Sequence, residues 1–279
     1  NAAVTGNDNT VIGKSAGANI TSGNSNVFMG RDAGGETLTG VLNTFVGYQA
    51  GKTYTGTGDT NTAIGASALQ AMNTGTQNTA LGANAGYSLT SGGNNVLIGH
   101  NAGDGFDTET HNLAIGKDAL GGPVAGGEFN VAVGNQTLDA VTSGDSNTAV
   151  GYNAGTSINS GGQNTLYGES AGGSITTGAG NVCIGQNAGN AGTILVSGNN
   201  CIYIGQAIRG TGEANNSEIV IGSLNVTGKG GQTAFINPDG GTIFNGGNTT
   251  AFQQTSDRRI KKNIVDNNIG LEAINKIQV

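Results

Sequence analysis

Residues 78–103 read NTALGANAGYSLTSGGNNVLIGHNAG, in which one phrase occurs twice at an interval of 17 residues. The phrase is Asn, a β-favouring residue, two apolar residues, Gly, two variable residues, Ala and then Gly or Leu. Its copies are spaced by 17 residues in eight of ten intervals and by 18 in two, and degraded copies reach Gly205 and Gly222. The copies start at Asn9, Asn26, Asn43, Asn61, Asn78, Asn95, Asn112, Asn130, Asn147, Asn164 and Asn181. Such regularity indicates a stack of units that bury their apolar sides only against their neighbours.

The start of each copy predicts a short strand, because a few β-favouring residues bounded by Asn and Gly cannot complete a helix. The remainder, such as TSGNS at 21–25, consists of turn-forming residues. We therefore predict an all-β, repetitive parallel β-solenoid with one rung per copy over residues 1–222. At ~4.8 Å per rung the rod would be about 60 Å long. The extra residues of the two longer intervals fall in loops near 52–60 and 121–129, where insertion costs little.

Two neighbouring columns of the strand are apolar. The third residue after each Asn is almost always aliphatic, as in Ile12, Ile64 and Ile98, and we expect this column to face a core. The preceding column, which includes Phe28 and Phe45, points the opposite way and is also apolar. A strand that is apolar on both faces is buried on both. A thin solenoid has one interior, so the second face predicts association around a shared axis, most simply as a homotrimer.

The repeated Asn predicts a ladder, because identical amides in register hydrogen-bond along a stack. The Gly that closes each strand predicts a corner with positive φ. We therefore take the eleven Asn residues given above as structural ladder residues.

Composition and charge exclude several classes of protein. The chain has 279 residues, 53 of them Gly, and 10% are charged, which is far from the average of soluble domains. Residues 1–250 hold six Lys or Arg against fifteen Asp or Glu, which argues against a nucleic-acid partner. No apolar run is long enough for a membrane span, and no signal segment opens the chain. The chain starts without Met and ends in a helix-like pattern, so we expect both ends to continue into a longer polypeptide.

The phrase NTxIG resembles the repeats of trimeric autotransporter adhesin heads over roughly residues 6–225. Those heads are left-handed parallel β-rolls in homotrimers, and their repeats are shorter than the one in this chain. The resemblance implies a fibrous, adhesive protein.

Residues 223–254 depart from the repeat and predict a Gly-rich β stem or connector. The segments 233–237 and 242–245, joined by the turn sequence Pro-Asp-Gly-Gly at 238–241, predict a hairpin.

Residues 255–279 read TSDRRIKKNIVDNNIGLEAINKIQV and form a basic module. They resemble the opening of the endosialidase-type intramolecular chaperone domain, an α-containing domain at the C-terminus of phage tail fibres and tailspikes that drives trimerisation. Only the N-terminal part of that domain would be present. In many members the domain cuts itself off.

That resemblance implies self-cleavage at the Thr255–Ser256 bond, with Ser256 as nucleophile and Lys261 as base. Chemically, a Ser hydroxyl needs a base, and a desolvated Lys with a lowered pKa can serve. Residues five apart share no helix or strand face, so a turn or a neighbouring subunit would have to bring them together. The alternative is that Ser256 is a helix N-cap and Lys261 a solvated charge.

Other chemistry-bearing residues are better explained structurally. His100 and His111 lack a second ligand at metal-binding spacing, and Asp104, Asp107 and Glu109 suit a solvated acidic loop better than a calcium site or a carboxylate pair. No cofactor and no metal are expected. We expect the two cysteines, Cys183 and Cys201, to be small buried thiols. Three tyrosines could stack on sugars: Tyr48, Tyr87 and Tyr152.

These patterns predict a structural and adhesive protein without metabolic activity. The first hypothesis is a phage tail-fibre shaft on the virion that binds a host surface receptor, with a glycan as candidate. The alternative is a bacterial surface trimeric adhesin. Under either hypothesis the protein would be extracellular. Weaker alternatives are a glycan-cleaving solenoid and an ice-binding one. Ice binding would use the Thr residues that follow the Asn, but Val27, Val96 and others interrupt this column and we expect it to be buried.

Overall fold

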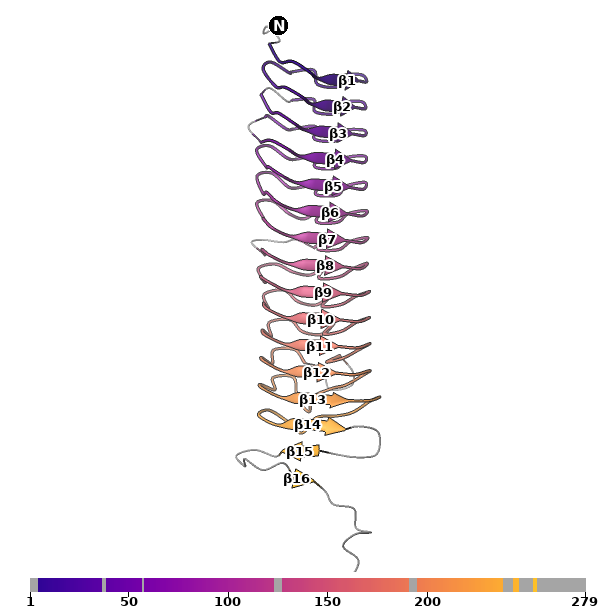
Figure 1. Cartoon of the computed structure of the whole chain (residues 1–279), viewed down its shortest axis with the longest axis vertical. Helices are drawn as coiled ribbons and strands as arrows, with labels where there is room; N and C mark the ends of the chain where they lie inside the picture. The colour runs from indigo at the N-terminus through magenta and orange to yellow at the C-terminus, as the bar shows by residue number, and fades with distance from the viewer. Residues whose placement is uncertain are drawn as a thin grey trace, which may run out of the picture.

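The structure is a computed structural model that describes residues 5–36, 39–56, 58–122, 127–190 and 195–237, together with the backbone of 243–245 and 253–254. In these parts it is all-β, with 14 parallel strands in a solenoid of about 13 turns and no helix. The strands lie above one another in a single column, and loops close each turn on the other side (Figure 1). The predicted fold class, a parallel β-solenoid with rungs of about 17 residues, is confirmed.

Each strand pairs with the next one along the chain, from β1 to β16. Their bounds are β1 Thr10–Ile12, β2 Val27–Met29, β3 Thr44–Val46, β4 Thr62–Ile64, β5 Thr79–Leu81, β6 Val96–Ile98, β7 Leu113–Ile115, β8 Val131–Val133, β9 Thr148–Val150, β10 Thr165–Tyr167, β11 Val182–Ile184, β12 Ile202–Ile204, β13 Ile219–Gly222, β14 Ala234–Asn237, β15 Ile243–Asn245 and β16 Gln253–Gln254. The register aligns equivalent repeat positions: Val96 faces Leu113, and Ile98 faces Ile115.

The stack changes direction at its C-terminal end. The parallel stack continues beyond residue 222, because β14 pairs parallel with β13. β15 then pairs antiparallel with β14. The predicted pairing of 233–237 with 242–245 is thus confirmed, and its turn at 238–241 lies outside the described residues. The segment 255–279, with the predicted chaperone-like sequence, also lies outside them.

The prediction of which column faces the core was wrong. The second residue after each Asn points into the solenoid: Phe28, Phe45, Ala63 and Leu97 are fully buried. The third residue, expected inside, faces outward, and Ile12 is 55% exposed. The reason is the Asn itself. Its side chain lies inside, and the two-residue period of a strand then puts the second residue inside and the first and third outside.

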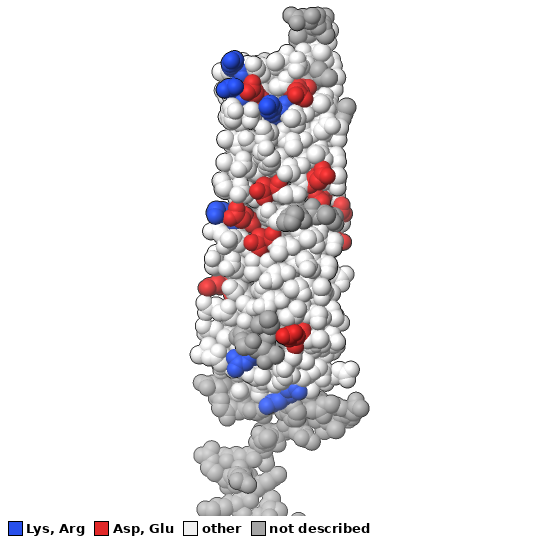
Figure 2. All heavy atoms as spheres, turned by 180° about the vertical axis from the view of Figure 1, so that it is seen from behind, with Lys and Arg blue, Asp and Glu red and all other residues white. Residues whose placement is uncertain are grey.

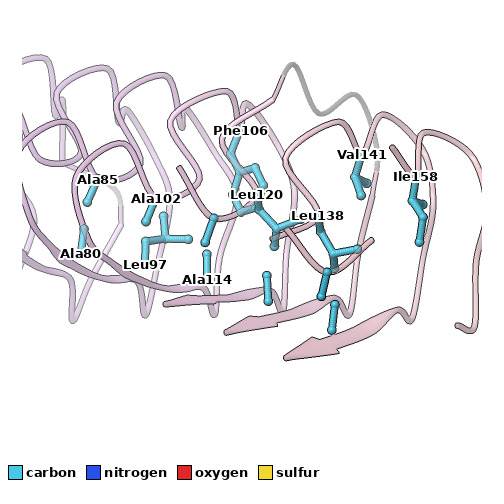
Figure 3. Close-up of a cluster of buried hydrophobic side chains, with 14 of the residues drawn as sticks. Ala80, Ala85, Leu97, Ala102, Phe106, Ala114, Leu120, Leu138, Val141 and Ile158 are labelled. Carbon is cyan, nitrogen blue, oxygen red and sulfur yellow. The ribbon is translucent and has the colours of Figure 1, made fainter. Parts of the chain in front are cut away.

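The interior is narrow, and large and small residues compensate each other between rungs. A Cβ on Gly86 would lie 2.7 Å from Leu69 Cδ2 and 2.8 Å from Leu97 Cδ1, so this glycine makes room for leucines of both neighbouring rungs. The strand residue of its own rung is the small Ala80. Figure 3 shows this core: Ala80, Leu97 and Ala114 come from the strands, Leu120 and Leu138 from the segments that follow them, and Phe106, Val141 and Ile158 from the opposite wall. Native packing density requires such compensation.

Each strand from β1 to β12 is followed by a glycine in a conformation that side chains avoid. The φ of Gly82 is +144° and that of Gly99 is +136°. A Cβ on Gly82 would also lie 2.3 Å from the Gly99 carbonyl oxygen. The corner therefore needs glycine both for its backbone angle and for the close approach of the next rung.

Replacing Gly86 by Ala should lower the free energy of unfolding by about 1–3 kcal/mol, because the new methyl group overpacks the core between Leu69 and Leu97. The residue also has a φ of +62°, which adds backbone strain. Guanidinium denaturation measures the change. The control is Gly35→Ala, where the nearest atom is 3.3 Å away and φ is not in the left-handed region. Equal midpoints for the two variants would contradict this account of the core.

Candidate functional site

The predicted ladder residues line the inside of the solenoid, on one column. From Asn26 to Asn181 each backbone N–H donates to Oδ1 of the ladder Asn one rung earlier, at 2.9–3.1 Å. The side-chain amide of Asn95 donates to Asn78 Oδ1 at 3.1 Å and to the Glu109 carbonyl at 2.8 Å. Each Asn therefore joins its own rung, its predecessor and its successor. Asn9, at the open end, is half-buried, whereas Asn26 and Asn95 are fully buried.

The ladder ends in a buried group that sequence reasoning missed. Cys201 takes the next position, and its N–H donates to Asn181 Oδ1 at 2.9 Å. Glu218 follows, fully buried, and its carboxylate accepts hydrogen bonds from Tyr203 Oη at 2.9 Å, Asn215 Nδ2 at 2.8 Å and the Gly230 N–H at 2.8 Å. Three donors compensate the buried charge and tie the last turns together. The replacement of Asn by Cys and Glu at the repeat position was the available signal.

The candidate functional site is the outward surface of the sheet, which we call the outer face. It comprises the first and third residues after the Asn position in β1–β13. The first column contains Thr10, Val27, Thr44, Thr62, Thr79, Val96, Leu113, Val131, Thr148, Thr165, Val182, Ile202 and Ile219. The third column contains Ile12, Met29, Val46, Ile64, Leu81, Ile98, Ile115, Val133, Val150, Tyr167, Ile184, Ile204 and Ile221.

No residue of the outer face is charged, although it runs the length of the solenoid. With rungs ~4.8 Å apart and two residue columns ~7 Å apart, it covers about 700 Å² once side-chain widths are included. This approaches the ~800 Å² that each partner contributes to a standard protein interface. Large uncharged apolar patches on a surface mark interaction sites. Charged side chains instead gather in small groups on the opposite side of the rod (Figure 2).

The Thr column is part of the outer face, so the expectation that it is buried was wrong for the single chain. Thr10, Thr79 and Thr148 are exposed. The interruptions by Val27, Val96 and the other aliphatic residues remain, so the column is not a continuous ladder of hydroxyl groups.

The other predicted candidates are dispersed. His100 and His111 are exposed on different parts of the turn, and no group of three or more His, Cys, Asp or Glu in the described residues is arranged to hold a metal. Glu109 is buried and accepts hydrogen bonds from the N–H groups of Asp107 and Thr108. Burial raises the pKa of Asp104, and the neighbouring Asp118 adds to the shift.

The two cysteines are buried free thiols. Burial raises the pKa of the Cys183 thiol and that of Cys201, which makes both poor nucleophiles. Among the three tyrosines that were sugar-binding candidates, Tyr48, Tyr87 and Tyr152 are all exposed, and Arg31 lies over the Tyr48 ring at 5.7 Å. Ser256 and Lys261 lie outside the described residues.

Within the described residues, no helix exists that would be capable of crossing a membrane. Comparison of the chain with protein-family models, with curated proteins and with solved structures finds no match.

Replacing Asn95 by Ala should lower the free energy of unfolding by about 2 kcal/mol, because it leaves the buried Asn112 N–H without its acceptor and removes the hydrogen bond to the Glu109 carbonyl. Thermal and chemical denaturation measure the loss. The matched control is Asn94→Gly, since Asn94 is exposed and glycine suits its φ of +60°. Unfolding of both variants at the same midpoint would show that the ladder bonds contribute nothing to stability.

Proposed function

We propose that this chain is the shaft of a homotrimeric adhesive fibre, most simply a bacteriophage tail fibre that carries out host attachment as part of the virion. The observation that carries the proposal is the outer face, which is uncharged on every rung from β1 to β13. The interior of each turn is already filled by its own side chains. A second apolar surface of this length is stabilised if other chains cover it.

A shared axis fits this surface better than a contact with an unrelated partner. The repeat places equivalent outward residues on successive rungs at a constant spacing. Copies of the chain aligned rung by rung would therefore match each other along the whole rod. Identical patches that meet in this way are typical of symmetric homo-oligomers. Parallel copies would place all C-terminal modules at one end, where a trimerisation chaperone could act.

The sequence of residues 255–279 supports the phage assignment over the bacterial adhesin. Its resemblance to the intramolecular chaperone domain implies folding of a tail fibre or tailspike. The resemblance of the repeat to adhesin heads favours the second candidate, a bacterial surface trimeric adhesin. That candidate requires a membrane anchor, which the full-length gene would reveal.

The trimer predicts a native mass of three chains of 27.5 kDa each. Replacing Ile98 by Glu puts a charge in the middle of the outer face and should convert the trimer to monomers, because the carboxylate would be buried without a partner. Native mass spectrometry at micromolar concentration measures both species. The control is Ser143→Glu, which adds the same charge at an exposed loop position. A monomeric wild-type chain would refute the proposed assembly.

Self-cleavage is tested by expressing the full-length gene. The wild type should give a chain that ends at Thr255 and a separate fragment that begins at Ser256, whereas Ser256→Ala should remain intact. The control is Ser223→Ala, which lies outside the chaperone-like sequence and should be cut like the wild type. Intact-mass measurement distinguishes the products, and identical masses for wild type and Ser256→Ala would eliminate this chemistry.

A further inference from the structure

Two aromatic rings stack on the surface of adjacent rungs, outside the two residue columns of the outer face. The His111 and Phe129 rings lie with centroids 4.9 Å apart and an interplanar angle of 19°. Both side chains are exposed, and Phe129 is 55% exposed. Each residue directly precedes a ladder Asn, so the ladder fixes the spacing of the rings along the rod.

The fold gives no reason for large rings at this position. His111 has a φ of +60° and Phe129 a φ of +58°, in the left-handed region that bulky residues avoid. Most other rungs have a small or polar residue here: Ser25, Thr60, Gln77, Asn94, Ser146, Gln163, Gly180, Asn200, Ser217 and Gln232. Exposed rings in a strained conformation bury no core and therefore need another explanation.

Polar groups surround the stacked rings. His111 Nδ1 lies 2.9 Å from Thr110 Oγ1, and the Thr110 hydroxyl donates to Glu128 Oε1 at 3.1 Å. With the Thr110 hydroxyl proton donated to Glu128, the imidazole donates from Nδ1, and Nε2 of the neutral ring is then a hydrogen-bond acceptor. Asp145 Oδ1 accepts a hydrogen bond from the Glu128 N–H at 2.8 Å and holds this loop in place.

The next rung offers no aromatic ring to stack on Phe129. Ser146 follows Phe129 in the same column, and its N–H donates to the Glu128 carbonyl at 2.9 Å. Its side chain is too small to cover the Phe129 ring. A rung rises ~4.8 Å, which lies within the spacing of about 4.5–7 Å at which flat rings stack. The space over Ser146 therefore suits one flat, ring-shaped ligand packed on Phe129.

We propose that His111, Phe129 and Glu128, which we call the aromatic platform, bind a neutral or amino sugar of a surface polysaccharide. A sugar presents one face of C–H groups, which packs on an aromatic ring, and a rim of hydroxyl donors. His111 Nε2 and the Glu128 carboxylate are the acceptors for those donors. Acidic sugars are disfavoured because Glu128 and Asp145 are negative and the chain carries a net charge of −7. The ligand class rests on the proposed function, and the position of the site rests on the geometry.

The test uses three probes: chitotetraose as amino sugar, maltotetraose as neutral sugar and oligogalacturonate as acidic sugar. Saturation-transfer NMR detects binding, and titration gives the dissociation constant. We expect binding of chitotetraose or maltotetraose and not of oligogalacturonate. Phe129→Ser, which copies the residue of the next rung, should weaken binding at least tenfold, or ~1.4 kcal/mol. Glu128→Gln should weaken it less, because the amide keeps one acceptor oxygen.

The matched control is Leu42→Ser. Leu42 occupies the same repeat position with a φ of +59° and is 57% exposed, so it shares the conformation and lacks the stacked ring. Its substitution should leave sugar binding unchanged.

Several outcomes would overturn the aromatic platform. These are no binding of chitotetraose or maltotetraose, preference for oligogalacturonate, or equal losses in Phe129→Ser and Leu42→Ser. A change of native mass in Phe129→Ser would instead assign the ring to a contact between copies of the chain. The native mass of the wild type tests the shaft separately, so failure of the sugar site and failure of the assembly are distinguishable.

Discussion

The structure depends on the hydrogen bonds of one buried asparagine per rung. Its Oδ1 accepts the backbone N–H of the next ladder Asn, and its Nδ2 donates to a loop carbonyl at the end of its own turn, as Asn78 does to Gly92. The amide thus satisfies polar backbone groups that the narrow interior would otherwise leave without partners. Because the same bonds recur on each rung, they also set the register in which apolar residues meet.

This constraint leaves little freedom for the rest of the turn. The inward Asn forces the residue two positions later into the core, and the core tolerates only complementary sizes, as at Gly86 between Leu69 and Leu97. The remaining strand positions must face outward. The packing of the interior does not require these outward residues, from Thr10 to Ile221, to be uncharged. Their lack of charge therefore favours the proposed contact with other copies of the chain.

A rigid, repetitive rod is suited to presenting surface features at fixed heights. Its backbone is held at every rung, so a side chain at a given repeat position has a fixed place along the axis. The stacked His111 and Phe129 rings use this property, since only the stacking of rungs brings two residues 18 positions apart into contact. Across this 18-residue interval the ladder is continuous, because the Asn130 N–H still donates to Asn112 Oδ1.

The sequence by itself determined the repeat, the rung length, the parallel strands and the position of the corners, because period and turn chemistry are local properties. It did not determine which apolar column points inward. Alternation separates the columns into two sets but does not orient them, and the hydrogen bonds of the Asn side chain decided it. Only the tertiary structure placed Glu218 among its three donors and His111 against Phe129, because those contacts join different turns. Comparison of the residues before each ladder Asn would have shown the two rings in one column, but their contact depends on how the rungs stack.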